Sequence, residues 1–467
     1  MKAIKQGTVA LMTLLSANVS SGGEFVKIRV NPEIEHQKID GFGASGAWWA
    51  QTVGGWPEEE IDSIIGLLYG PKGAALSMYR FNVGAGGGEE IEDPWRRAET
   101  FETGSGTYDW KRDANAIRIL RKIRGCGVNQ YVFFANSPPT RLTRSGMASG
   151  GPGGGPNLKP GAEEEFAQYL LDVTEYWKEH LSLPSVTVSP INEPQWKWGG
   201  DGRGQEGCNY TPAGAAQLLR AVAAEIERRN SSILLEGPEA ARWGHETPEY
   251  LDAVLDEEGL APRLHRLAIH SYFSNREEKA ATLDFLKKRG SYPPIAMTEW
   301  CEMKHGRDTG MESALTLARV IHEDLTLVNA SSWAVWIAVS RYDYRDGLLY
   351  IDPDSRNVVP TKRLWVAGQF ARYIRPDFVR IHASADPSSL LVTGFRSPEN
   401  SEVVLVLINP EDDELSVQFD WSHPAAEFTL KDVQVTSGSA DLSEVEQTGS
   451  PVTLQRKSVT TIRFARR

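Results

Sequence analysis

The sequence predicts an α/β protein, a (β/α)8 TIM barrel with an appended β-sandwich, and three observations support this prediction. The chain has 467 residues, enough for one large and one smaller domain. From about residue 39 to 375, eight short apolar runs alternate with amphipathic helical segments, as expected for strands buried on both faces of a closed parallel sheet. After residue 376 the helical pattern stops, and short strand-like runs separated by turn residues predict a β-domain.

These patterns divide the chain into a leader, an N-terminal strand, a catalytic barrel and a C-terminal β-sandwich. Their residues are 1–23, 24–38, 39–375 and 376–467, in that order. In the leader, Lys2 and Lys5 precede an apolar run over residues 9–15, which predicts a signal peptide and a secreted protein; a disordered leader is the alternative. Residues 26–30 alternate in hydrophobicity, so we expect them to add a strand to the sandwich.

The barrel elements follow from apolar runs and helix-end signals. The predicted strands are 39–43, 76–83, 130–136, 186–191, 233–236, 267–272, 295–298 and 332–339. Pro57 followed by three glutamates opens the first helix, which Gly70 ends. Thr-Pro pairs at 211–212 and 247–248 open two later helices. Helical spacing predicts further helices over 113–124, 163–179 and 312–328. The sandwich strands are predicted at 390–395, 403–408, 415–419, 428–430 and 458–464.

Composition excludes some classes of partner. A net charge of −12 and a pI near 5.4 predict no nucleic-acid binding, which normally needs basic patches. Beyond the leader, no apolar run reaches the roughly 18 residues of a membrane span, so we expect no membrane partner. The 14 tryptophans fit a protein that stacks flat rings on sugars, or simply a large core. The three cysteines show no metal-ligand spacing. We expect a monomer that uses no metal and no cofactor.

Two glutamates are the candidate catalytic residues. Glu193 in Ser-Pro-Ile-Asn-Glu-Pro follows the fourth predicted strand, and Glu299 in Met-Thr-Glu-Trp follows the seventh. Because active sites of TIM barrels lie at the carboxyl ends of the strands, both side chains are expected at one face. Cleavage of a glycosidic bond needs such a pair, one proton donor and one nucleophile or base. We expect a protonated Glu193 to donate to the leaving oxygen and an ionised Glu299 to attack the anomeric carbon.

Further residues at strand ends are candidates for binding substrate or orienting the glutamates. Arg80 is a candidate donor to Glu299, or forms an ordinary salt bridge at the barrel top. Asn192 is a candidate donor to the sugar 2-hydroxyl. His270 is expected to orient the nucleophile, or to be a core histidine. Tyr272 is expected to contact a carboxylate or the substrate. Candidates for sugar contact also include Asn136, alternatively a cap, and the tryptophans Trp48, Trp49, Trp196, Trp198, Trp300 and Trp336.

Several of these motifs together resemble glycoside hydrolase family 30. They are Gly41-Phe42-Gly43, Arg80-Phe81-Asn82, Phe134-Ala135-Asn136-Ser137-Pro138, Asn192-Glu193-Pro194-Gln195 and Thr298-Glu299-Trp300. The resemblance covers nearly the whole chain and implies a β-sandwich built from both termini. It also implies a retaining mechanism, with Glu193 as acid/base and Glu299 as nucleophile. Residues 43–49 and 192–198 are most similar to the endo-β-1,6-galactanase branch, whose substrates are the side chains of arabinogalactan.

Alternative functions remain open at this point. One alternative is a related hydrolase of the same family that acts on another glycan, such as glucuronoxylan, β-1,6-glucan or a glucosylceramide-like substrate. Lys304, His305, Arg307 and Arg341 leave recognition of an acidic sugar open, because glucuronoxylanases of this family read such a sugar with basic residues of the seventh and eighth loops. A glycan-binding protein without turnover is a further alternative. The β-sandwich either binds glycan or covers the flank of the barrel.

Overall fold

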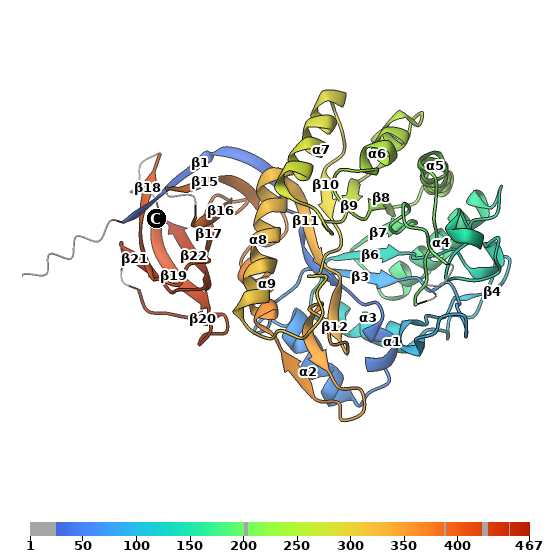
Figure 1. Ribbon diagram of the computed structural model, residues 1–467, viewed down its shortest axis with the longest axis horizontal. Helices are drawn as coiled ribbons and strands as arrows, with labels where there is room; N and C mark the ends of the chain where they lie inside the picture. Colours follow the sequence, from blue (N-terminus) through green and yellow to red (C-terminus); the bar gives the residue numbers. More distant parts are fainter. Residues whose placement is uncertain (1–24, 200–203, 387–388, 423–427, 448) are drawn as a thin grey trace, which may run out of the picture.

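The computed structural model describes residues 25–199, 204–386, 389–422, 428–447 and 449–467. A barrel and a separate β-sheet domain lie side by side in it (Figure 1). The leader predicted at 1–23 lies outside the described residues. Among the described helices, none is long and apolar enough to cross a membrane.

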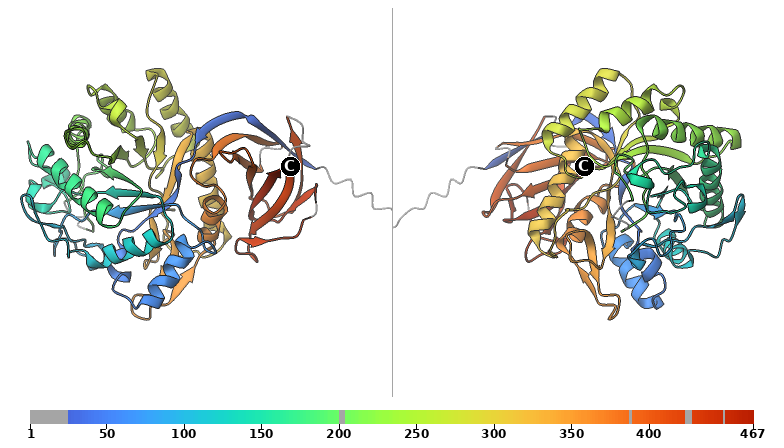
Figure 2. Two further views of the ribbon diagram at one scale, coloured as in Figure 1. Left: turned by 180° about the vertical axis from the view of Figure 1, so that it is seen from behind. Right: turned by 45° about the vertical axis from the view of Figure 1, so that its right-hand side comes forward.

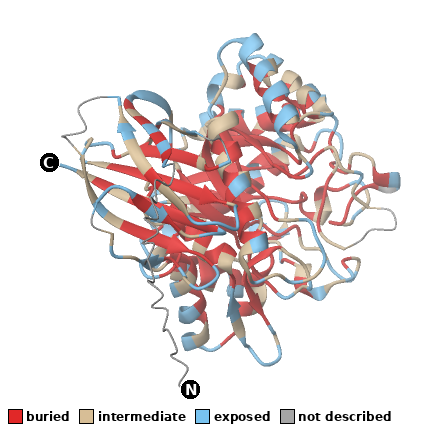
Figure 3. Cartoon of the chain, turned by 60° about the vertical axis from the view of Figure 1, so that its left-hand side comes forward, coloured by how far each residue is buried: buried red, intermediate tan, exposed pale blue. Residues whose placement is uncertain are grey.

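The barrel is closed by eight parallel strands in the order β10-β11-β2-β3-β6-β7-β8-β9, which confirms the predicted fold class. Their bounds are β2 Gly41–Ser45, β3 Met78–Asn82, β6 Gln130–Phe134, β7 Ser185–Ser189, β8 Leu234–Ala240, β9 Arg266–Ile269, β10 Ile295–Met297 and β11 Ala330–Val335. These strands are buried at the centre of the molecule (Figure 3). Gly43 allows β2 to approach β3 closely, because a Cβ there would lie 2.5 Å from the carbonyl oxygen of Met78.

Helices surround the barrel, as expected for this fold (Figure 2). Their bounds are α1 Trp49–Val53, α2 Glu58–Tyr69, α3 Ala114–Gly125, α4 Glu163–His180, α5 Pro212–Arg229, α6 Thr247–Asp256, α7 Arg276–Arg289, α8 Met311–Leu327 and α9 Lys362–Ala371. The sequence patterns gave no prediction for α7, which is rich in charged residues. A capping box, in which Asn275 and Glu278 exchange side-chain and backbone hydrogen bonds, marks its beginning.

The eighth predicted strand, 332–339, was wrong in its extent. The barrel strand β11 ends at Val335, and the chain continues after Trp336 as β12 (Ile337–Ser340). Strand β12 leaves the barrel and pairs with β13 (Gly347–Ile351), which also pairs with β14 (Val358–Pro360). Both strands are apolar and buried, so hydrophobicity alone does not reveal the break between them. Trp336 therefore lies at the exit from the barrel and not inside a strand.

The second domain is a nine-stranded sheet in the order β20-β19-β22-β17-β16-β15-β1-β18-β21. The bounds are β1 Val26–Lys38, β15 Val379–Asp386, β16 Leu391–Arg396, β17 Glu402–Asn409, β18 Leu415–Trp421, β19 Phe428–Thr436, β20 Ser443–Glu444, β21 Val452–Leu454 and β22 Ser458–Arg466. Strand β1 pairs with β15 and β18, so the N-terminal segment does contribute to this domain. The sheet folds over on itself: the rings of Phe419 and Phe464, from strands that are not neighbours, lie 5.0 Å apart.

The sheet domain covers one flank of the barrel, against α8 and α9 (Figure 1). Gln369 of α9 connects the two domains. Its side-chain amide donates to Thr436 Oγ1 at 2.9 Å, and its backbone carbonyl accepts from the Thr461 hydroxyl at 2.8 Å. A short hairpin of β4 (Glu102–Gly104) and β5 (Thr107–Tyr108) lies in the loop between β3 and α3.

Candidate active site

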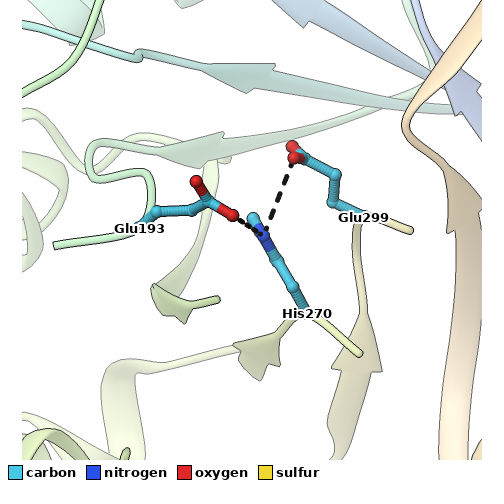
Figure 4. A group of neighbouring side chains, drawn as sticks. All are labelled: Glu193, His270 and Glu299. Atoms are coloured by element: carbon cyan, nitrogen blue, oxygen red, sulfur yellow. Dashed lines mark hydrogen bonds and ion pairs between the residues drawn. The ribbon is translucent and has the colours of Figure 1, made fainter. Parts of the chain in front are cut away.

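The site lies where strands β7, β9 and β10 end, at one face of the barrel. Glu193 follows β7, His270 follows β9 directly, and Glu299 follows β10. Figure 4 shows the two carboxyl groups approaching the imidazole of His270 from opposite sides. All three side chains are buried. Glu193 has a φ of +46°, a left-handed backbone conformation that is uncommon for a residue other than glycine and clusters at functional sites.

The two glutamates are close enough to act on one bond. An oxygen of the Glu193 carboxyl lies within 4.8 Å of an oxygen of the Glu299 carboxyl. Retaining glycosidases hold their carboxyl groups roughly 5–5.5 Å apart, whereas inverting enzymes leave roughly 6.5–9.5 Å for a water molecule. The predicted pair is thus brought together at the shorter of these spacings.

Arg80 and Tyr272 hold the Glu299 carboxylate. The guanidinium of Arg80 donates to Oε2 at 2.9 Å, and the hydroxyl of Tyr272 donates to Oε1 at 3.1 Å. Arg80 lies in β3 and Tyr272 follows β9, two strands on opposite sides of the closed barrel. Burial raises the pKa of Glu299, while His270 and Arg80 act against that rise. The donors therefore favour the ionised form that a nucleophile needs.

His270 bridges Glu193 and a third carboxylate, Glu239. Its Nδ1 lies 3.2 Å from Glu193 Oε1 and 3.7 Å from Glu299 Oε1, and its Nε2 lies 2.8 Å from Glu239 Oε2. Burial alone would lower the pKa of His270, but the surrounding carboxylates outweigh burial and raise it to about 10. At neutral pH the ring is an imidazolium with both N–H groups donating. We predicted an orienting role toward the nucleophile, and the closer contact is with Glu193.

Glu239 is the functional residue that sequence reasoning missed. It is fully buried in β8, and its carboxylate also accepts from Arg80, Ser189 and Thr298. Burial opposes ionisation, but Arg80 and His270 outweigh it and lower the pKa of Glu239 to about 2. The fifth strand was predicted to end at Glu236, and Glu239 has a φ of +60°, beyond a proline. A strand three residues longer would have placed Glu239 among the strand-end candidates.

The Glu193, His270 and Glu299 cluster also has ligand types that suit a metal ion, and its donor atoms lie within 4.8 Å of one another. A histidine ligand must be neutral, with a free lone pair on nitrogen. The carboxylates around His270 raise its pKa to about 10, so a metal ion bound to this ring would have to displace a proton.

Two adjoining cavities open at this face. The first, of about 310 Å³, is lined by both glutamates, Tyr272, Trp196 and Phe273, among others. The second, of about 620 Å³, is lined by Trp48, Arg96, Asp343 and Asp346, among others. They share the lining residues Gln205, Met303 and Trp336. Their volumes leave room for more than one sugar ring.

The predicted tryptophans divide into two groups. Trp196 and Trp336 are partly exposed and line the cavities, and Trp48 supports Trp336 edge-on at 5.2 Å between ring centres. Trp49 does not join them. Its ring is 0% exposed, and its indole N–H donates to the carbonyl of Ser45 at 2.9 Å, so it packs inside the wall and offers no face to a sugar.

The two predicted asparagines lie buried at the same face. Asn136 donates to Asn82 Oδ1 at 3.1 Å, which leaves its own Oδ1 without a protein partner. Asn192 Oδ1 also has no partner among the described residues. Buried polar atoms are normally hydrogen-bonded, and unpaired ones call for an explanation. Hydroxyl groups of a bound sugar would supply the missing donors.

Replacing Glu239 with glutamine is expected to destabilise the protein in a pH-dependent way. Removing one partner of a buried ion pair costs about 3–5 kcal/mol. The stabilisation from Glu239 is present above its ordinary pKa of 4.5 and is lost as pH falls through about 2. The stabilisation from His270 is complete below pH 6.5, the ordinary pKa of histidine, and is lost as pH rises through about 10. The difference from wild type in urea unfolding should therefore be largest between about pH 4.5 and 6.5.

Glu236→Gln is the matched control for this measurement. Glu236 is equally buried in the same strand, but it pairs with Arg266 at 2.7 Å and not with His270. Replacing Glu236 with glutamine should leave the alkaline side of the pH profile of unfolding free energy as in wild type. A Glu239→Gln difference that stays constant from pH 3 to pH 10 would contradict the charges assigned to Glu239 and His270.

A closed parallel barrel with two neighbouring carboxyl groups at the carboxyl ends of its strands defines a glycoside hydrolase. The chain belongs to O-glycosyl hydrolase family 30, whose family profile matches residues 25–258 and 295–350. The resemblance drawn from the sequence motifs is thereby confirmed.

Comparison with individual proteins supports this placement. The chain is similar to an endo-β-1,6-galactanase of Hypocrea rufa, with 20% identity over 74% of each protein. The crystal structure of a conserved exported protein from Bacteroides fragilis matches with a TM-score of 0.83 and 24% identity, over 93% of this chain and 99% of that one. The catalytic domain of the GH30 xylanase C from Talaromyces cellulolyticus matches with a TM-score of 0.76 and 19% identity, over 94% and 100%. The two structures show the shared fold.

Proposed function

We propose that this protein is a secreted, retaining endo-β-1,6-galactanase that hydrolyses the β-1,6-galactan side chains of arabinogalactan. The observation that carries the mechanism is the separation of at most 4.8 Å between oxygens of Glu193 and Glu299. The similarity to the galactanase of Hypocrea rufa, which extends over three quarters of both chains, supports the substrate. The leader pattern at residues 1–23 supports secretion.

The proposed reaction is a double displacement. Glu299, held by Arg80 and Tyr272, attacks the anomeric carbon while Glu193 protonates the leaving oxygen. A glycosyl ester forms on Glu299, and Glu193 becomes a carboxylate. The imidazolium of His270, 3.2 Å from Glu193, stabilises that carboxylate. Glu193 then removes a proton from water, which releases the sugar with its anomeric configuration retained.

The charges around the larger cavity favour a neutral sugar over a glucuronate. Arg341 donates to Asp93 at 2.7 Å, Arg96 donates to the Tyr342 hydroxyl at 2.9 Å, and Arg307 donates to backbone carbonyls. Lys304 lies 3.8 Å from Glu312. Lys304, Arg307 and Arg341, three of the four basic residues that left an acidic substrate open, are thus engaged within the protein. Asp343 and Asp346 add acidic groups to the same wall, and these would repel a carboxylate on the substrate.

Product analysis tests the substrate and the mode of cleavage. De-arabinosylated arabinogalactan, glucuronoxylan and β-1,6-glucan are incubated separately with the enzyme, and the products are resolved by chromatography. We expect a ladder of β-1,6-galacto-oligosaccharides from the first polysaccharide alone. A single disaccharide would change the mode from endo to exo. Aldouronic acids from xylan without galactan products would contradict the galactanase assignment.

A further inference from the structure

A buried ion pair outside the active site connects two outer helices to the end of strand β9. Lys279 of α7 and Asp324 of α8 are both buried, and Lys279 Nζ lies 2.9 Å from Asp324 Oδ1. Removing two charges from water costs free energy, and apolar residues of similar volume could fill the same space without that cost. The contacts of Asp324 point to a use for the charge.

Asp324 reaches the active site through Ser271. The hydroxyl of Ser271 donates to Asp324 Oδ1 at 2.9 Å and accepts from the indole N–H of Trp243 at 2.8 Å. Ser271 stands between His270, whose ring contacts Glu193 and Glu239, and Tyr272, whose hydroxyl donates to Glu299. His270 and Tyr272 therefore face the catalytic carboxylates while Ser271 faces outward to α8.

We infer that Asp324 is a positioning residue, which sets the orientation of His270 and Tyr272 toward the two catalytic glutamates by anchoring Ser271. The inference rests on the proposed two-glutamate reaction. Through this contact, one carboxylate on an outer helix fixes both the donor to Glu193 and the donor to Glu299.

The surroundings of residue 324 require a side chain that only accepts hydrogen bonds. Besides Ser271 and Lys279, the indole N–H of Trp333 donates to Asp324 Oδ2 at 2.9 Å. Lysine and tryptophan can donate but cannot accept. Asparagine at 324 would turn one oxygen into an NH2 group that faces a donor. The volume would be kept, but the anchor on Ser271 or on Trp333 would be lost.

Glu323 provides a matched control on the same helix. It also contacts Lys279, at 3.3 Å, and pairs with Arg276 at 3.3 Å, but the structure gives it no contact with Ser271. Glu323→Gln therefore removes the charge that faces Lys279 but leaves the contact between Asp324 and Ser271 in place. Ser271→Ala does the opposite, because it removes the link and leaves Asp324 paired with Lys279.

The experiment compares Asp324→Asn, Ser271→Ala and Glu323→Gln with wild type, on whichever substrate wild type hydrolyses in the product analysis. For the first two variants we expect kcat to fall roughly 10–100-fold with KM nearly unchanged, as for a small misplacement of catalytic groups. Loss of a well-aligned donor to Glu299 disfavours its ionised form, so the acidic limb of kcat/KM should move to higher pH. A double variant that combines Asp324→Asn with Ser271→Ala should be no slower than Asp324→Asn alone, since both changes break the same contact between Asp324 and Ser271. Glu323→Gln should keep the wild-type kcat and profile.

Titration of the His270 imidazole by NMR gives a second readout that needs no substrate. The ring should stay protonated to about pH 10 in wild type and in Glu323→Gln, and should lose its proton at lower pH in Ser271→Ala. A wild-type kcat, pH profile and His270 titration in Ser271→Ala would overturn the inference, even if Asp324→Asn fails to fold. Failure of the galactanase proposal would instead appear as a different substrate for wild type and every variant, with the ratios between them unchanged.

Discussion

Replacement of Glu299 by alanine is expected to lower kcat by a factor on the order of 10⁵–10⁶, as for removal of other covalent nucleophiles. Without this carboxylate no glycosyl ester can form, and no neighbouring group can replace it. Tyr272 and Arg80 lie within hydrogen-bonding distance of Glu299, but both are donors to it. The loss should be measured on the natural glycan and on an aryl glycoside with a good leaving group, and it should be equally severe on both.

Azide provides a direct control for the role of Glu299. In the alanine variant the vacated space next to the anomeric carbon admits a small anion, which attacks in a single displacement. The expected product from a β-glycoside is the α-glycosyl azide. Rescue that gives the β-glycosyl azide would show that Glu299 is not the nucleophile.

Replacement of Glu193 by alanine is expected to lower kcat on the natural glycan by roughly 10²–10⁴, the usual contribution of a general acid. The effect depends on the leaving group, because a dinitrophenolate departs without a proton. With a dinitrophenyl glycoside the ester on Glu299 should still form rapidly and then accumulate, since no base activates water. A burst of dinitrophenol followed by a slow steady state is the expected time course.

The same variant should respond to azide in the opposite stereochemical sense to the Glu299 variant. Azide attacks the accumulated ester from the face that Glu193 has vacated, so the product should be the β-glycosyl azide. Equal losses of kcat/KM, which reports formation of the ester, on natural and activated substrates would contradict the assignment of Glu193 as acid/base.

Much of the fold could be predicted because most of the barrel strands are short, mainly apolar runs. The pattern fails where two buried strands follow each other, as at Trp336, since burial of both strands hides the change from barrel to β12. It also fails for α7, whose residues are mostly charged and carry only a weak apolar stripe. Beginning and capping signals, such as Asn275 with Glu278, are more informative there than hydrophobicity.

The proximity of Glu193 and Glu299 could be predicted because strand ends of a barrel converge, so that two glutamates far apart in sequence share one face. Glu239 could not be predicted, because it lies in an irregular part of β8, where its own backbone is left-handed. The distinction between Trp49 and Trp336 also needed the structure. Both follow a strand, but Trp49 begins helix α1 and turns into the core, whereas Trp336 faces the cavities.

The central claim is that Glu193 and Glu299 perform a double displacement. The most direct test is a ¹H NMR time course of hydrolysis of a β-linked galacto-oligosaccharide, recorded before mutarotation mixes the anomers. The account predicts that the β-anomer of the new reducing end appears first, with the α-anomer following only as mutarotation proceeds. Initial formation of the α-anomer would show inversion and would contradict the mechanism proposed from the spacing of the two carboxyl groups.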